Sequence, residues 1–137
     1  MSQLVVLDNE AVQALGDPAH PKHHRVLSHV QVVANRKRRA AQISLVVPTA
    51  VRVEAGWDRT SPAWAFLNRL RIADVPLDST SASTAAAIRN RTKVSVADSH
   101  IGATVQASLA TEITVLTSDP NDMRRAAEGQ PVTIVAI

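Results

Sequence analysis

The chain has 137 residues, of which 45% are apolar, and this size and composition favour one globular domain with one hydrophobic core. Cysteine is absent, which excludes disulfides, thiolate zinc sites and a cysteine nucleophile, and no apolar run approaches the ~18 residues that a membrane helix needs. The formal charge of +3 allows a phosphate-rich partner but does not require one. We therefore expect a single cytoplasmic domain over residues 1–137 that does not bind a membrane.

Apolar segments that recur along the chain predict the strands. The first, Leu4 to Leu7, is an unbroken apolar run of the kind found in strands that are covered on both faces. The third contains Pro76, and because proline is tolerated at sheet edges we expect this strand at an edge. The predicted strands are residues 4–7, 43–47, 71–77, 112–117 and 132–137.

The segments between these strands predict helices. In the second of them, Val26, Val30 and Val33 recur at helical spacing. Thr49 and Ser61 are expected to cap the two helices that follow the second strand. The predicted helices cover about residues 11–15, 22–41, 50–55, 62–70, 79–91, 101–109 and 120–128, with a loop or short extended piece at 93–97.

Strands that alternate with helices through short connections predict an α/β/α sandwich around a mostly parallel sheet of about five strands. In such sheets the ligand crevice lies beyond the carboxyl ends of the strands. Carboxylates that meet there need a compensating cation, and Mg²⁺ or Mn²⁺ is the natural partner of oxygen ligands. The sequence therefore predicts a metal site formed by acids near the strand ends, namely Asp8, Glu54, Asp98 and Asp119.

Each acid also has a purely structural explanation. Asp119 precedes Pro120, and Asp98 precedes a helical segment, so either could cap a helix. Asp8 could be a turn residue, and Glu54 alone would be a solvated helix residue. It is the set of four, rather than any single acid, that favours the metal site. His100 is expected either on a helix surface or near a substrate phosphate.

A basic cluster ends the second predicted helix. Cations at this position complement the negative end of the helix dipole, so a solvated helix end explains them. Contact with RNA phosphates explains them equally well, and in that case they would guide RNA towards the site. The cluster consists of Arg36, Lys37, Arg38 and Arg39.

Four segments, in order, resemble the motifs of the PIN-domain family, and within it the VapC-type toxins of type II toxin–antitoxin systems. The first is an apolar strand that ends in Asp8, and the second is a hydroxyl residue followed by a helix, a glutamate and a nearby glycine. The third is an aspartate that opens a helix of small residues, and the fourth is a threonine, a serine and an aspartate with a further acid beyond. The segments are residues 4–8, 47–56, 96–103 and 115–123.

This resemblance implies a PIN-like fold and an endoribonuclease that cleaves RNA phosphodiester bonds by metal-activated water, with Mg²⁺ or Mn²⁺ as cofactor. It implies metal-binding and catalytic roles for Asp8, Glu54, Asp98 and Asp119, with Asp122 as an alternative fourth ligand. Thr49 and Ser118 become candidates for substrate contact. The expected partners are an RNA substrate such as tRNA or rRNA, a cognate antitoxin protein and a second copy of the chain in a homodimer.

A non-catalytic regulatory module, similar to a receiver domain, is the alternative. That fold also places acids at the ends of parallel strands. It would need a phospho-accepting aspartate after the third strand, where Asp78 stands, and a lysine near the last strand. The chain has no lysine beyond Lys93, which counts against this alternative.

Overall fold

The computed structural model describes residues 2–37 and 42–137. Its sheet has five parallel strands in the order β3-β2-β1-β4-β5, so the predicted sandwich and its parallel sheet are confirmed. β1 lies at the centre and β3 at an edge, as their sequences indicated. The strands are β1 (Ser2–Leu7), β2 (Gln42–Pro48), β3 (Ala73–Val75), β4 (Glu112–Thr117) and β5 (Thr133–Ala136).

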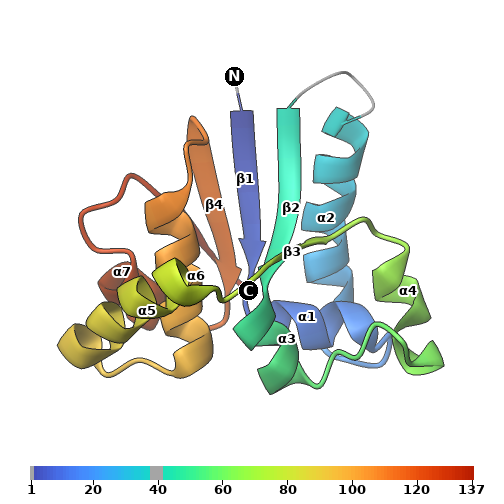
Figure 1. The fold of residues 1–137 in the computed structure, drawn as a ribbon. Helices are drawn as coiled ribbons and strands as arrows, with labels where there is room; N and C mark the ends of the chain where they lie inside the picture. Colours follow the sequence, from blue (N-terminus) through green and yellow to red (C-terminus); the bar gives the residue numbers. More distant parts are fainter. Residues whose placement is uncertain (1, 38–41) are drawn as a thin grey trace.

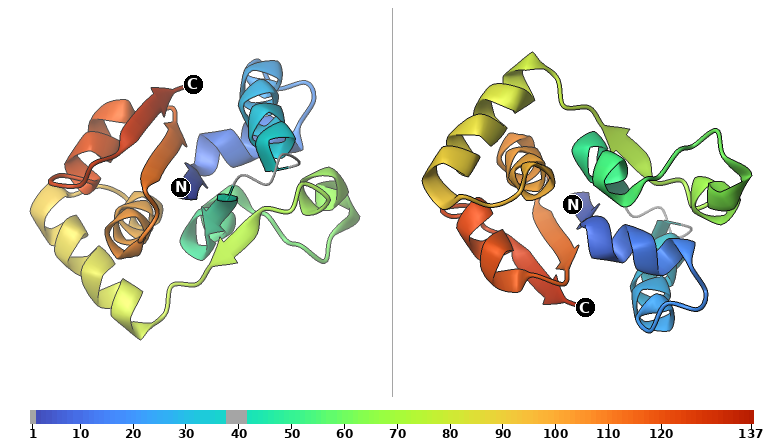
Figure 2. Two further views of the ribbon diagram at one scale, coloured as in Figure 1. Left: turned by 90° about the horizontal axis from the view of Figure 1, so that it is seen from above. Right: turned by 90° about the horizontal axis from the view of Figure 1, so that it is seen from below.

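Helices cover both faces of the sheet. α1 and α2 lie against one face, whereas α5, α6 and α7 lie on the other (Figure 2). None of the helices in the described part of the chain combines the length and the apolar character needed to cross a membrane. The helices are α1 (Asn9–Gly16), α2 (His23–Lys37), α3 (Thr49–Ala55), the 3₁₀ turn η1 (Pro62–Trp64), α4 (Ala65–Asn68), α5 (Ser79–Thr92), α6 (Val96–Ala107) and α7 (Pro120–Ala126).

The core is built from aliphatic side chains on both sides of β1. Val6 and Leu7 are fully buried, which is why the first strand reads as an unbroken apolar run. Gly102 on α6 is needed for close helix packing, because a Cβ there would lie 2.7 Å from the carbonyl oxygen of Ala126 at the end of α7. This close approach fixes α6 against α7, and each of these two helices carries acids of the predicted site.

Two predicted helix starts are wrong. Thr49 does not cap α3: Pro48 precedes the helix, and the Thr49 hydroxyl instead accepts a hydrogen bond from the Leu77 amide at 3.0 Å. α6 begins at Val96, within the segment expected to be a loop, because the Ser95 hydroxyl caps it by accepting from the Asp98 amide at 3.1 Å. Asp98 therefore lies inside the first turn and is not the capping residue.

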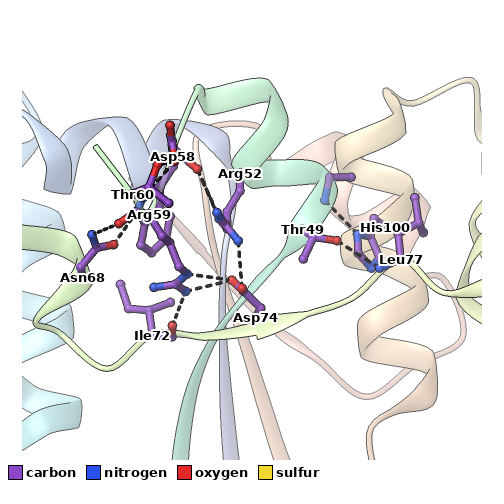
Figure 3. Close-up of polar contacts among 12 residues, drawn as sticks. Thr49, Arg52, Asp58, Arg59, Thr60, Asn68, Ile72, Asp74, Leu77 and His100 are labelled. Atoms are coloured by element: carbon purple, nitrogen blue, oxygen red, sulfur yellow. Dashed lines mark hydrogen bonds and ion pairs between the residues drawn. The ribbon is translucent and has the colours of Figure 1, made fainter. Parts of the chain in front are cut away.

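A polar network ties the edge strand β3 to α3 and to the segment after it (Figure 3). The Asp74 carboxylate accepts from Arg52 and from Arg59, each at 2.8 Å. The Arg59 guanidinium also lies 4.4 Å from the ring centroid of Trp57, which is buried. The network holds β3 in place at the edge of the sheet, where it pairs with β2.

Candidate metal centre

The predicted acids gather at the carboxyl edge of the sheet, where the strand arrows of Figure 1 end. Asp8 follows β1, and Asp119 stands two residues beyond β4. Glu54 lies on α3, which follows β2 directly, and Asp98 lies on α6. Asp122, the alternative ligand, lies in the first turn of α7. We call Asp8, Glu54, Asp98, Asp119 and Asp122 the carboxylate site.

Asp8 is the most constrained of these acids. Its side chain is only 4% exposed, and its two carboxylate oxygens accept hydrogen bonds from the Ala11 amide at 2.8 Å and the Ser118 amide at 3.0 Å. Asp8 therefore caps α1 and also fastens the end of β4 to the end of β1. Burial raises the pKa of Asp8, while the hydrogen bonds from Ala11, Thr117 and Ser118 oppose that rise.

Asp98 lies where the negative charges of the site meet. Because Ser95 caps α6, the Asp98 carboxylate is not used to start the helix. Burial, as the larger cause, and the charges of the other four members of the carboxylate site together raise the pKa of Asp98 to about 7. Acids from three other segments of the chain thus act on one carboxylate.

Three of the acids are close enough together to share an ion. One ligand atom from each of Asp98, Asp119 and Asp122 lies within 4.8 Å of the others, and we call these residues the aspartate triad. Asp119 also caps α7 through the Asp122 amide at 3.4 Å. Among the described residues this is the group of histidine and acid side chains with spacing suited to a metal ion.

Asp119 and Asp122 differ in their electrostatics. A hydrogen bond between the two carboxyl groups raises the pKa of Asp119 and lowers the pKa of Asp122. Arg125 pairs with Asp122, lowers its pKa further, and donates to the Thr92 carbonyl at 3.1 Å. Asp122 is thus the acid of the pair that is held in its ionised form, and both acids lie within the aspartate triad.

Glu54 is exposed and lies outside the aspartate triad, although its charge acts on Asp98. It borders an apolar groove of about 590 Å³, to which Val53, Leu77 and Val96 contribute exposed side chains. Glu54 and Asp8 therefore act on Asp98 through their charges, although their ligand atoms are not part of the aspartate triad. An ion bound by the triad would attract these two carboxylates through the same field.

The candidates for substrate contact are divided between the two ends of the molecule. Thr49 and Ser118 both lie at the carboxyl edge, and the Ser118 amide contacts Asp8. Arg36 and Lys37 end α2 beside the start of β2, at the opposite edge of the sheet from the acids (Figure 1). Arg38 and Arg39 lie outside the described residues.

One of the two alternatives for His100, a position on the helix surface, is wrong. Its side chain is fully buried on α6, and its Nδ1 atom accepts from the Ala50 amide at 3.3 Å. Helical periodicity did not predict the burial of His100, because Ile101 and Val105 already define an inward face of this helix. The buried neighbours Ser99 and Thr104 show that α6 is covered almost all round, which a polar sequence does not reveal.

Known proteins resemble this chain in structure rather than in sequence. No protein-family model and no curated protein sequence matches it. The crystal structure of FitAcB from Neisseria gonorrhoeae matches with a TM-score of 0.57 and 19% identity over 95% of each chain. The structure of VapBC2 from Rickettsia felis bound to a promoter DNA fragment matches with a TM-score of 0.60 and 10% identity over 98% of each chain. The fold is PIN-like.

A third structure, FitAB bound to an IR36 DNA fragment, matches with a TM-score of 0.57 and 18% identity over 96% of this chain and 94% of the other. At such low identities the likeness concerns the fold alone. The PIN-like sheet order also argues against the receiver-like alternative, because receiver sheets have their third strand inside the sheet. Here β3 is at an edge, and Asp78 caps α5 by accepting from the Ser81 amide at 2.8 Å.

Proposed function

We propose that this protein is a Mg²⁺- or Mn²⁺-dependent endoribonuclease and the toxin of a toxin–antitoxin pair. The observation that carries the proposal is the gathering of acids at one place: ligand atoms of Asp98, Asp119 and Asp122 lie within 4.8 Å of one another. Burial and the charges of four other acids accordingly raise the pKa of Asp98. Such a concentration of negative charge costs stability unless a cation is bound. Its place at the carboxyl edge of a parallel sheet is where ligands bind in folds of this kind.

The donor set fits a hard divalent cation. All five members of the carboxylate site offer oxygen ligands, and cysteine is absent from the chain. The aspartate triad would hold the ion, with Asp8 and Glu54 as further ligands or as charges that orient bound water. A divalent ion bound there supplies Lewis acidity for attack of water on a phosphodiester. The hydrogen bonds to Asp8 and the pairing of Arg125 with Asp122 keep these carboxylates in place for that role.

The partner assignments are supported by the structural neighbours. FitAB and VapBC are complexes of two proteins, and two of the three structures also contain DNA. By analogy, we propose that this chain binds a cognate antitoxin, forms a homodimer in the cytoplasm and cleaves RNA such as tRNA or rRNA. A short neighbouring gene for a DNA-binding protein would support the toxin assignment.

The ribonuclease proposal is tested with protein purified under denaturing conditions and refolded, so that no antitoxin remains bound. We expect it to cleave a pool of cellular RNA with Mn²⁺ or Mg²⁺ and to lose activity in EDTA. Asp98→Asn should reduce cleavage on the order of 100-fold or more, because it removes a ligand rather than an outer partner. The matched control is Glu112→Gln, an exposed acid at the start of β4 and hence at the opposite edge of the sheet. Equal activity of Asp98→Asn and the wild type, or cleavage that persists in EDTA, would contradict the proposal.

A further inference from the structure

Helix α3, which carries Glu54, begins without a cap from its own sequence. The first amides of any helix lack partners within that helix and must be satisfied by other groups. The residue before α3 is Pro48, whose side chain has no acceptor, and no side-chain capping bond is made at this position. The Thr49 hydroxyl is used elsewhere, since it accepts from the Leu77 amide.

His100 supplies the missing acceptor from another helix. Its Nδ1 atom accepts from the Ala50 amide in the first turn of α3, although the two residues are 50 positions apart (Figure 3). The imidazole is fully buried, so the histidine side of this bond is shielded from water. His100 therefore acts as a capping group for α3 in the way that a serine or aspartate does from within the sequence.

This contact requires a neutral imidazole with its proton on Nε2, because only the unprotonated nitrogen can accept. Burial lowers the pKa of His100 and so favours the neutral form, while the backbone carbonyl of Pro76 opposes that change. The Nε2 atom is buried and has no hydrogen-bond partner of good geometry in the described residues. A purely apolar side chain would avoid this cost, so packing alone does not explain a histidine here.

The cap joins the two helices that bring acids to the site from the middle of the chain. His100 lies two residues beyond Asp98 on α6, and Ala50 lies four residues before Glu54 on α3. Four residues are about one helical turn, so Glu54 lies one turn beyond the capped residue on a helix of only seven residues. The bond between the Thr49 hydroxyl and Leu77 ties the same turn to the segment after β3.

We propose that His100 is a positioning residue of the carboxylate site, which caps α3 from α6 and thereby fixes Glu54 relative to Asp98. The inference rests on the proposed metal site, because its consequence is the geometry of the ligands. His100 does not contact the ion or the substrate. It acts through the helix start that it holds, as outer partners of metal ligands do.

Three substitutions separate this role from packing. His100→Asn keeps an acceptor oxygen one bond from Cγ, at the place of Nδ1, and should retain the bond to Ala50. His100→Gln keeps a polar amide but moves its oxygen one bond further out, and His100→Leu keeps the bulk without any acceptor. The Asn and Gln pair remains informative if the Leu variant does not fold. Asp98→Asn serves as the reference for loss of a ligand.

Two measurements are made on each refolded variant. Isothermal titration with Mn²⁺ should give an affinity for His100→Asn within about 3-fold of the wild type, and an affinity roughly 10-fold lower for the Gln and Leu variants. Amide hydrogen exchange measured by NMR should show Ala50 protected in the wild type and in His100→Asn, and unprotected in the other two. This second measurement does not depend on metal binding.

The outcomes distinguish the two proposals. Equal Mn²⁺ affinity of the Asn, Gln and Leu variants would overturn the positioning role while leaving the metal site intact, provided that Asp98→Asn weakens binding. Protection of Ala50 that survives in His100→Leu would overturn the cap itself. A wild-type protein that binds no Mn²⁺, or an Asp98→Asn variant that binds it normally, would overturn the metal site and with it the role given to His100.

Discussion

Asp98→Asn should make the metal-free protein more stable at neutral and alkaline pH, although it removes a residue of the proposed site. The substitution deletes one negative charge from a place where four other acids act on it. Asparagine has nearly the same shape as aspartate, so packing changes little. A gain in stability on loss of a ligand would be a direct measure of the electrostatic cost of the empty centre.

The size of the effect follows from the pKa of Asp98, which rises from 3.8 to about 7 on folding. The two values differ by about 3, which at ~1.4 kcal/mol for each pKa unit corresponds to an upper limit of ~4 kcal/mol. Because the side chain is partly exposed and solvent screens the charge, we expect about half of this limit, or ~2 kcal/mol.

The direction of the Asp98 pKa shift determines the pH range in which the substitution changes the stability. The pKa of this acid is raised in the folded protein, so the native state binds more protons than the unfolded chain and its stability falls as pH rises. The contribution of Asp98 is fully present below pH 3.8 and is lost as pH rises to about 7. The advantage of Asp98→Asn should therefore be near zero at pH 4 and reach ~2 kcal/mol at pH 8.

Urea denaturation in EDTA, followed by circular dichroism at pH 5, 6, 7 and 8, measures this difference. Saturating Mn²⁺ should reverse the order at pH 8, because a ligand that binds only the native state stabilises the protein that retains the site. Glu112→Gln serves again as the control and should show no such dependence on pH. An Asp98→Asn variant that is no more stable than the wild type at pH 8 without metal would refute the electrostatic argument.

Two further substitutions test the packing and the backbone around the site. Gly102→Ala should lower the free energy of unfolding by about 2 kcal/mol, because the added Cβ would lie 2.7 Å from the Ala126 carbonyl oxygen and 3.0 Å from Ile88. Alanine has the higher helix propensity, so a higher urea midpoint for the variant would show that propensity outweighs the close approach and would contradict this prediction. Lys93→Gly should raise the free energy of unfolding by about 1 kcal/mol, because Lys93 ends α5 with a φ of 64° that glycine adopts without strain. A urea midpoint below that of the wild type would contradict this prediction.

The fold was predictable because its strands carry strong local signals. β1 is an unbroken apolar run, and it lies at the centre of the sheet with Val6 and Leu7 buried. The proline at the end of the third segment likewise indicated the edge strand β3. These signals depend on burial and on backbone chemistry, which act over a few residues and can be read from the chain.

The errors concern contacts between distant residues. Thr49 has the chemistry of a helix cap, but its hydroxyl is taken by the Leu77 amide, and the acceptor for α3 comes from His100. A sequence shows that a group can accept a hydrogen bond, but not which of several donors the fold will bring to it. The same limit applies to Asp119 and Asp122, since only the fold shows that both lie in the aspartate triad.

The structural and functional explanations of the acids are not exclusive, and the parallel sheet is the reason. The residue after a parallel strand stands both at the start of the next helix and at the edge of the ligand crevice. Asp8 and Asp119 occupy such positions, and each caps a helix while belonging to the carboxylate site. Helix amides stabilise the ionised form of a capping carboxylate. Asp98 lies inside a helix that Ser95 caps, and in the described part of the chain its carboxylate accepts no such hydrogen bond. Unlike the exposed Glu54, Asp98 is also partly buried, so water compensates its charge less. This makes Asp98 the acid whose ionisation depends most on a bound cation.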